Sequence, residues 1–134
     1  MEKETIFTKI RDGIIPSNKL YEDELCFVIL DINPIKKGHI LVISNKPYTD
    51  ISECPDDVIS HLIKIAKMFD LKLREKLKCD GTNILINNGS SSGQEIPHIH
   101  IHVIPRYKND GIKFGFSHEK YEENEISKFK EMLI

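Results

Sequence analysis

The segment from Pro97 to Pro105 constrains the fold more than any other, because polar and apolar side chains alternate strictly from His98 to Val103. Its histidines are His98, His100 and His102, and aliphatic residues lie between and after them. A period of two is typical of a β-strand, whose successive side chains point to opposite faces. We therefore predict a strand with three imidazoles on one face, and with Ile99, Ile101 and Val103 turned to the core.

The spacing of the three histidines limits what they can bind. Neighbouring histidines in a strand stand roughly 6.6 Å apart at their Cα atoms, and the outer two stand roughly 13 Å apart. All three cannot converge on one metal ion, and a catalytic zinc site would need a further His, Asp or Glu. The spacing suits an extended substrate that meets a different imidazole at each of several atoms. A solvated edge strand that happens to carry histidine is the structural alternative.

Composition indicates one soluble globular domain over residues 1–134, with 40% hydrophobic and 30% charged residues. The net charge of −2 gives no electrostatic basis for binding nucleic acid or an anionic membrane surface. The three cysteines are widely spaced, which suggests neither a zinc knuckle nor a disulfide framework. There is no recognisable signal peptide and no apolar run long enough to cross a bilayer. We therefore expect a cytoplasmic protein.

The remaining patterns predict the other elements of an α+β fold. Helices are expected over residues 5–13, 55–78 and 119–134, and further strands over 19–22, 25–30, 39–44 and 82–86. The long helix has a core-facing stripe that includes Val58, Leu62 and Phe69. In the last helix, Ile126, Phe129 and Leu133 mark the expected buried side. The sum is a mostly antiparallel five-stranded sheet with one long helix and a C-terminal helix.

A polar loop, residues 87–94, precedes the histidine strand, and His39 opens another strand. We expect the loop to present free backbone N–H groups, which can cradle an anion. No Ser–His–Asp arrangement is recognisable, and few acids are available to hold Mg²⁺. A neutral histidine is a competent nucleophile, and phosphate oxygens suit a row of imidazole donors. Attack on phosphorus would proceed through a phosphohistidine-type intermediate, with the neighbouring imidazoles stabilising charge and protonating the leaving group.

The pattern His-φ-His-φ-His-φ-φ, where φ is apolar, resembles the signature of the histidine-triad (HIT) family of nucleotide-binding proteins. The resemblance extends in order through four separated parts of the chain: 7–17, 21–24 with 30–43, 87–89 and 93–97. It implies a HIT-like fold and a nucleotidyl hydrolase or transferase that acts at the α-phosphate of purine nucleotides. Nucleoside phosphoramidates and dinucleoside polyphosphates both remain candidate substrates. A nucleotide-binding interaction module with incidental turnover is the alternative, and an intact His100 argues against it.

The resemblance also implies a role for each matching residue. His100 takes the position of the nucleophile, His102 and His39 contact the phosphate, and His98 orients its neighbours through hydrogen bonds. Asp31 takes the position that binds the ribose hydroxyls, which suits a carboxylate acceptor. The phosphate side is lined by Asn87, Gly93 and Gln94, with Glu95 following, and the apolar slot for the base by Phe7, Ile10, Ile29 and Ile32. For these last four, plain core packing is the alternative.

The sequence departs from the family's pattern at two places. Some members bind zinc through Cys-x-x-Cys and a later histidine, whereas the corresponding positions here are Thr5, Thr8 and Pro47, so no structural zinc and no cofactor is expected. Glu95 stands where the phosphoramidase-like branch has Ser or Thr, which leaves the leaving-group preference open. The family also implies a two-fold homodimer. Strand 82–86 has few edge-protecting residues, and a final helix that folds back over it is the alternative.

Overall fold

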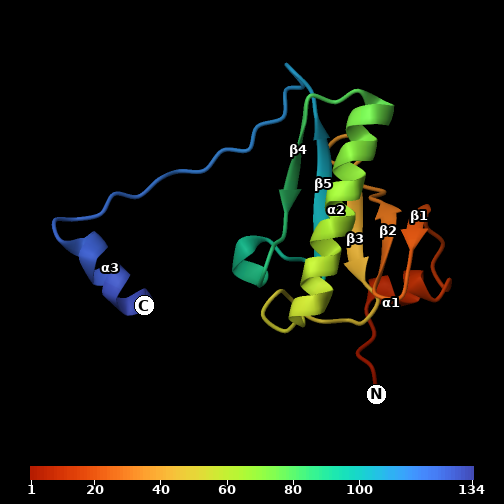
Figure 1. The fold of residues 1–134 in the computed structure, drawn as a ribbon, viewed down its shortest axis with the longest axis horizontal. Helices are drawn as coiled ribbons and strands as arrows, with labels where there is room; N and C mark the ends of the chain where they lie inside the picture. The colour runs from red at the N-terminus through yellow and green to blue at the C-terminus, as the bar shows by residue number, and fades with distance from the viewer.

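A five-stranded antiparallel sheet forms the centre of the computed structural model, which describes residues 1–134 (Figure 1). The sheet order is β1-β2-β3-β5-β4. Its strands are β1 (Lys19–Glu22), β2 (Cys26–Leu30), β3 (Ile40–Ser44), β4 (Gly81–Leu85) and β5 (His100–Arg106). The helices are α1 (Ile6–Arg11), α2 (Asp56–Leu77) and α3 (Glu125–Leu133), and a 3₁₀ turn, η1, spans Ser90–Ser92. The α+β class and the five-stranded sheet predicted from the sequence are confirmed.

Strand β5 is the last strand in the chain, yet it lies inside the sheet between β3 and β4. His102 pairs with Leu41 of β3, and His100 pairs with Ile43. On the opposite face of β5, Ile101 and Val103 are fully buried. The strict alternation of the sequence therefore places an aliphatic row in the core and two imidazoles on the other face.

Helix α2 covers the face of the sheet to which Ile101 and Val103 point (Figure 1). Its predicted stripe is confirmed, since Val58, Leu62 and Phe69 all pack into this larger core cluster. A smaller cluster forms on the other face, where Phe7 and Ile10 of α1 pack on β2 and β3. Because both faces are covered, β2 and β3 are the continuous apolar runs expected of strands buried on two sides.

The C-terminal region differs from the prediction. Helix α3 begins at Glu125, and a long arm between β5 and α3 carries it away from the sheet (Figure 1). Its predicted buried side is exposed, with Ile126 at 61%, Phe129 at 42% and Leu133 at 80%. Amphipathic periodicity states which face a helix can bury, but not whether this protomer covers it. The expectation of a buried face is wrong here, and α3 does not cap β4. No helix of the structure has the length and apolar character needed to cross a membrane.

Candidate active site

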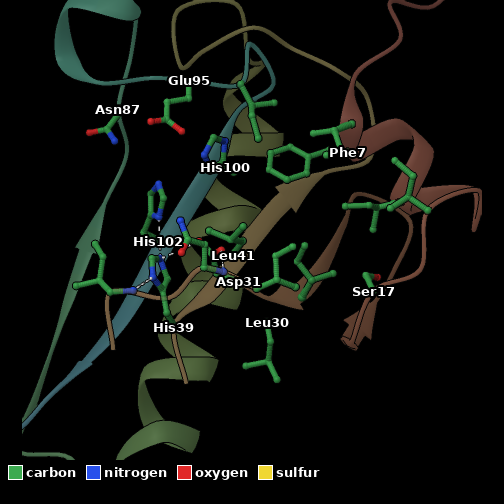
Figure 2. Close-up of a pocket in the computed structure, with 18 of the residues that line it drawn as sticks. Phe7, Ser17, Leu30, Asp31, His39, Leu41, Asn87, Glu95, His100 and His102 are labelled. Atoms are coloured by element: carbon green, nitrogen blue, oxygen red, sulfur yellow. Dashed lines mark hydrogen bonds and ion pairs between the residues drawn. The ribbon is translucent and has the colours of Figure 1, made fainter. Parts of the chain in front are cut away.

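A cavity of about 450 Å³ opens on the sheet face opposite α2. Figure 2 shows His100 and His102 of β5 pointing into it, with His39 below them and Phe7 of α1 beside His100. Its apolar wall includes the buried residues Phe7, Ile10, Ile29 and Leu41. Sequence elements far apart in the chain thus meet around two histidines of the motif.

The hydrogen bond of His100 determines which of its ring nitrogens carries the proton. Nδ1 of His100 lies 2.7 Å from the carbonyl oxygen of His98. A carbonyl can only accept, so Nδ1 must be the protonated donor. In the neutral ring Nε2 then carries a free lone pair. The backbone two residues earlier therefore holds His100 in the tautomer that a nucleophile needs.

A second chain of hydrogen bonds fixes His39 and His102. The backbone N–H of Ile35 donates to Nδ1 of His39 over 3.1 Å, so the proton of neutral His39 is on Nε2. Nε2 of His39 lies 2.9 Å from Nδ1 of His102 and donates to it (Figure 2). Neutral His102 therefore carries its proton on Nε2. The cavity is presented with a lone pair on His100 and an N–H donor on His102, the pair of functions that attack on a phosphate requires.

Gly38 allows His39 to reach this position. Its φ of +98° lies in the left-handed region, and a Cβ there would lie 2.7 Å from Cδ1 of Leu77. Glycine is therefore the residue that fits between β2 and β3 next to the end of α2. His39 itself precedes β3, which begins at Ile40, and its side chain is 2% exposed.

His98 does not join the row of imidazoles, and the predicted strand start is wrong by two residues. Strand β5 begins at His100, while His98 is fully buried and does not line the cavity. Its Nε2 donates to the carbonyl of Ser44 over 2.7 Å, and Thr5 Oγ1 donates to its Nδ1 over 2.7 Å. Because both nitrogens are hydrogen-bonded within the protein, the ring points into the core. The alternation rule would instead have placed it on the sheet face that holds His100 and His102. The contribution of His98 to the site is the carbonyl that holds His100.

The contact between Thr5 and His98 is the one at this site that the sequence analysis did not predict. Thr5 is the N-cap of α1, and its hydroxyl accepts from the Thr8 N–H over 3.1 Å while donating to His98. The Thr-x-x-Thr spacing before an apolar run is a recognisable capping signal. Helix α1 is thereby fixed to the motif, and Phe7 packs edge-on against both His98 and His100, at 5.4 Å and 5.0 Å between ring centroids.

All four histidines are held in their neutral forms by burial. Desolvation lowers the pKa of His98 and of His102 to about 4, and it also lowers the pKa of His39 and of His100. For His39 and His100 the nearby Asp31 carboxylate opposes the shift without reversing it. The tautomers deduced above therefore describe the site at neutral pH.

Asp31 and the predicted apolar slot lie around the same cavity. Asp31 Oδ2 is 3.7 Å from Nε2 of His39, which is too long for a hydrogen bond and leaves this oxygen available to a ligand. Phe7, Ile10 and Ile29 line the wall, while Ile32 lies at the mouth and is 91% exposed. The first three also serve as core, so both interpretations weighed from the sequence apply to them.

The loop before β5 contributes less than predicted to an anion site. The N–H groups of Ser92, Gly93 and Gln94 donate to carbonyls of residues 89 and 90 within the loop. The Gln94 side chain is also occupied, since it accepts from the Gly89 N–H and donates to the carbonyls of Thr49 and Ile96. The expected free backbone cradle is therefore wrong at these positions. Gly93, Asn87 and Glu95 do line the cavity, whereas Gln94 does not.

Two groups of side chains could bring three metal-ligating atoms within 4.8 Å of one another. One is Asp31, His39 and His102 in the cavity, and the other is Asp23, Cys26 and His61 on the α2 side. In each group a histidine is already hydrogen-bonded to another member, at 2.9 Å and 2.6 Å respectively. The family's zinc position does not fit the metal, because Thr5 and Thr8 offer hydroxyls instead of thiolates and Pro47 has no ligand atom in its side chain.

Comparison with known proteins identifies the family. The model of the HIT domain matches residues 12–109. The chain belongs to the HIT family. It is 48% identical over 112 residues to an uncharacterised HIT-like protein of Methanocaldococcus jannaschii, covering 82% of this chain and 86% of that protein.

Two further relatives bear enzyme names. An adenosine 5′-monophosphoramidase of Saccharomyces cerevisiae is 33% identical over 130 residues, covering 96% of this HIT protein and 80% of the yeast protein. An adenylylsulfatase of Arabidopsis thaliana is 37% identical over 110 residues, covering 82% of this chain and 56% of that one. The crystal structure of a HIT family protein from Bacillus anthracis superposes with a TM-score of 0.88 at 32% identity, covering 99% of this chain and 96% of that chain.

Proposed function

We propose that this HIT protein hydrolyses nucleotides at the α-phosphate through a covalent nucleotidyl intermediate on His100. The observation that carries the proposal is the pair of fixed tautomers, with the lone pair of His100 Nε2 and the N–H of His102 Nε2 presented to one cavity. The enzyme names of two relatives support hydrolysis of a nucleotide. The base lies in the apolar slot by Phe7, and the ribose hydroxyls lie at Asp31.

In the proposed reaction, Nε2 of His100 attacks the α-phosphorus and the bond to the leaving group breaks. The His98 carbonyl accepts from Nδ1 and stabilises the positive charge that the ring then carries. The Nε2–H of His102 donates to a non-bridging phosphate oxygen. The leaving group takes its proton from solvent as it departs. Water then attacks the phosphorus as the bond to Nε2 breaks: its oxygen stays on the released nucleoside monophosphate, its protons return to solvent, and Nε2 of His100 regains its lone pair.

The covalent step is tested by mass spectrometry of protein mixed with adenosine 5′-phosphoramidate and denatured at alkaline pH, where phosphoramidate bonds to histidine survive. The expected result is an added adenylyl group on the peptide that contains His100. His100→Asn should show neither the adduct nor turnover, whereas the exposed control His118→Asn should show both. An adduct on another residue, or turnover by His100→Asn, contradicts the mechanism.

The role of Asp31 is tested with two kinds of ligand. Asp31→Ala should weaken binding of a ribonucleotide by on the order of tenfold, the value of one charge-assisted hydrogen bond, with little effect on a 2′,3′-dideoxy analogue. Equal losses for the two ligands would make Asp31 a structural residue. Asp31 Oδ1 already accepts from the Asn33 N–H at 2.9 Å, so its removal also breaks a structural contact. The comparison of the two ligands separates that effect from the loss of ribose binding.

We also propose a homodimer formed at β4. This strand is paired on one side only, and its Ile84 is exposed. The other edge strand, β1, is short and carries Lys19 and Glu22, which discourage pairing. The arm to α3 leaves the sheet past β4 (Figure 1), and its uncovered apolar face is a further surface for a second copy. A mass near one chain by light scattering, unchanged by dilution and with full activity, would contradict the dimer.

We propose a cytoplasmic location from the state of the cysteines. Cys26, Cys54 and Cys79 are all free and buried. Burial raises the pKa of the Cys26 thiol to about 12 and that of Cys54 to about 11, so these thiols are inert core residues. Free thiols without a disulfide partner suit a reducing compartment, and fractionation of the native host would test the location.

A further inference from the structure

Thr5 lies outside the cavity, yet one residue connects its hydroxyl to the proposed nucleophile. Thr5 is buried, and it is not among the residues that line the cavity. Oγ1 of Thr5 and Nδ1 of His98 are 2.7 Å apart, and the His98 carbonyl oxygen lies 2.7 Å from Nδ1 of His100. His98 therefore joins the start of α1 to the imidazole on which the proposed reaction depends.

The direction of each hydrogen bond around His98 is determined by its partners. The carbonyl of Ser44 can only accept, so Nε2 of His98 carries the proton of the neutral ring. Nδ1 then offers only a lone pair, and the Thr5 hydroxyl must donate to it. Because the His98 ring is fully buried, removal of this hydroxyl leaves an acceptor without a partner inside the protein.

The carbonyl of His98 is not held directly by the sheet. Strand β5 begins at His100, and its pairs with β3 and β4 do not include His98. The N-terminal segment supplies contacts instead. Besides the bond from Thr5, Lys3 Nζ donates to the carbonyl of Pro97 over 2.7 Å. Phe7 packs edge-on against the rings of His98 and His100, beside which it lies in Figure 2. The orientation of the carbonyl thus depends on the start of α1.

We propose that Thr5 is a positioning residue for His100, whose hydroxyl acts through His98 to hold the nucleophile in its reactive tautomer. The inference rests on the proposed function and adds to it a residue outside the cavity. With the hydroxyl present, the His98 ring keeps one orientation and its carbonyl faces Nδ1 of His100. Without the hydroxyl, the ring changes orientation to satisfy Nδ1, and the carbonyl moves with it. His100 can then place its proton on Nε2, which leaves no lone pair there for attack.

The test separates this role from the part that Thr5 plays in capping α1. Thr5→Val keeps the shape of the side chain and removes the hydroxyl, whereas Thr5→Ser keeps the hydroxyl. The matched control Thr8→Val removes the other half of the same capping box and leaves the bond from Thr5 to His98 in place. Both valine variants should lower Tm, because each loses a capping hydrogen bond.

Kinetics should distinguish the two valine variants. Thr5→Val should lower kcat by on the order of tenfold, the value of one hydrogen bond. KM should change little, because Thr5 does not line the cavity. Thr5→Ser and Thr8→Val should keep kcat near the wild-type value.

The tautomer itself is measured by NMR, from the ring nitrogen chemical shifts of His100 in the ligand-free protein at neutral pH. Wild type, Thr5→Ser and Thr8→Val should show the proton on Nδ1, and Thr5→Val should show a mixture of both tautomers. Thr5→Ala lacks the hydroxyl and adds no bulk, so it gives the same measurement if Thr5→Val does not fold.

Equal falls in kcat for the two valine variants would overturn the inference, as would a His100 proton that stays on Nδ1 in Thr5→Val. A raised KM with unchanged kcat in Thr5→Val would also overturn it, because Thr5 would then act only on the Phe7 wall through α1. The proposed function is judged separately by the adenylyl adduct on wild-type His100. Absence of that adduct refutes the covalent mechanism, while the NMR measurement still decides whether Thr5 sets the tautomer.

Discussion

Acidification should destabilise the fold through His98, the buried histidine whose two nitrogens are both bonded to the protein. Burial lowers its pKa from 6.5 to about 4 in the folded state, while the unfolded chain keeps the ordinary value. Because the folded pKa is depressed, the stabilisation is complete above pH 6.5 and is lost as the pH falls toward 4. At 1.36 kcal/mol per tenfold change in proton affinity, the loss by pH 4 is about 3 kcal/mol.

This loss is measured by urea unfolding at pH 7 and at pH 4, followed by circular dichroism, for the wild type and for His98→Asn. The variant is less stable at pH 7 but lacks the titrating ring, so its free energy of unfolding should fall by about 3 kcal/mol less over this interval. Other groups that titrate in the same range contribute to both proteins and cancel in the difference. His118→Asn, on the exposed arm, is the matched control and should behave as the wild type does.

Equal pH dependence of the wild type and His98→Asn would refute this reasoning. A direct check is the titration of the His98 ring by NMR. A midpoint near 6.5 in the folded protein would show that burial and the bond from Thr5 do not hold the ring neutral.

Three further predictions concern the core, the nucleophile and zinc. Ile101→Asp places a charge in the fully buried face of β5 and should cost more than about 4 kcal/mol, so its circular dichroism spectrum at 25 °C should be that of an unfolded chain; a native spectrum would contradict the packing. The acid limb of kcat/KM should have its midpoint below 6.5, because burial lowers the pKa of His100; a midpoint at or above 6.5 would contradict a buried nucleophile. Dialysis against EDTA should leave Tm and activity unchanged, because Thr5, Thr8 and Pro47 offer no thiolate or imidazole where zinc would bind, and a fall in Tm would show a structural metal.

The sequence predicted those features of the fold that depend on local periodicity. Alternation in β5 correctly separated Ile101 and Val103 from His100 and His102, and the stripe on α2 marked its buried side. Periodicity failed at His98, where two hydrogen bonds to distant segments outweigh the continuation of the strand. It failed also at α3, whose apolar face was recognised although nothing in one protomer covers it.

The electrostatic character of the site could not be deduced before the chain was folded. The alternating histidines indicated phosphate chemistry, but their tautomers depend on the backbone carbonyl of His98 and the backbone N–H of Ile35, groups that almost any residue carries. The chain has 19 lysines and arginines, and only the fold shows that none of them lines the cavity.

The position of β5 also constrains the order in which the polypeptide can acquire structure. Strand β4 pairs with β5 alone, so a chain folded only as far as residue 86 has a three-stranded meander and a fourth strand without a partner. Closure requires β5 to insert between β3 and β4, which joins segments about 60 residues apart and makes this a slow, non-local step. The same strand brings His100 and His102 to His39, so the three imidazoles meet only once β5 has paired with β3. During refolding, the helical signal of α2 can return early, whereas enzymatic activity should return only with the closing of the sheet.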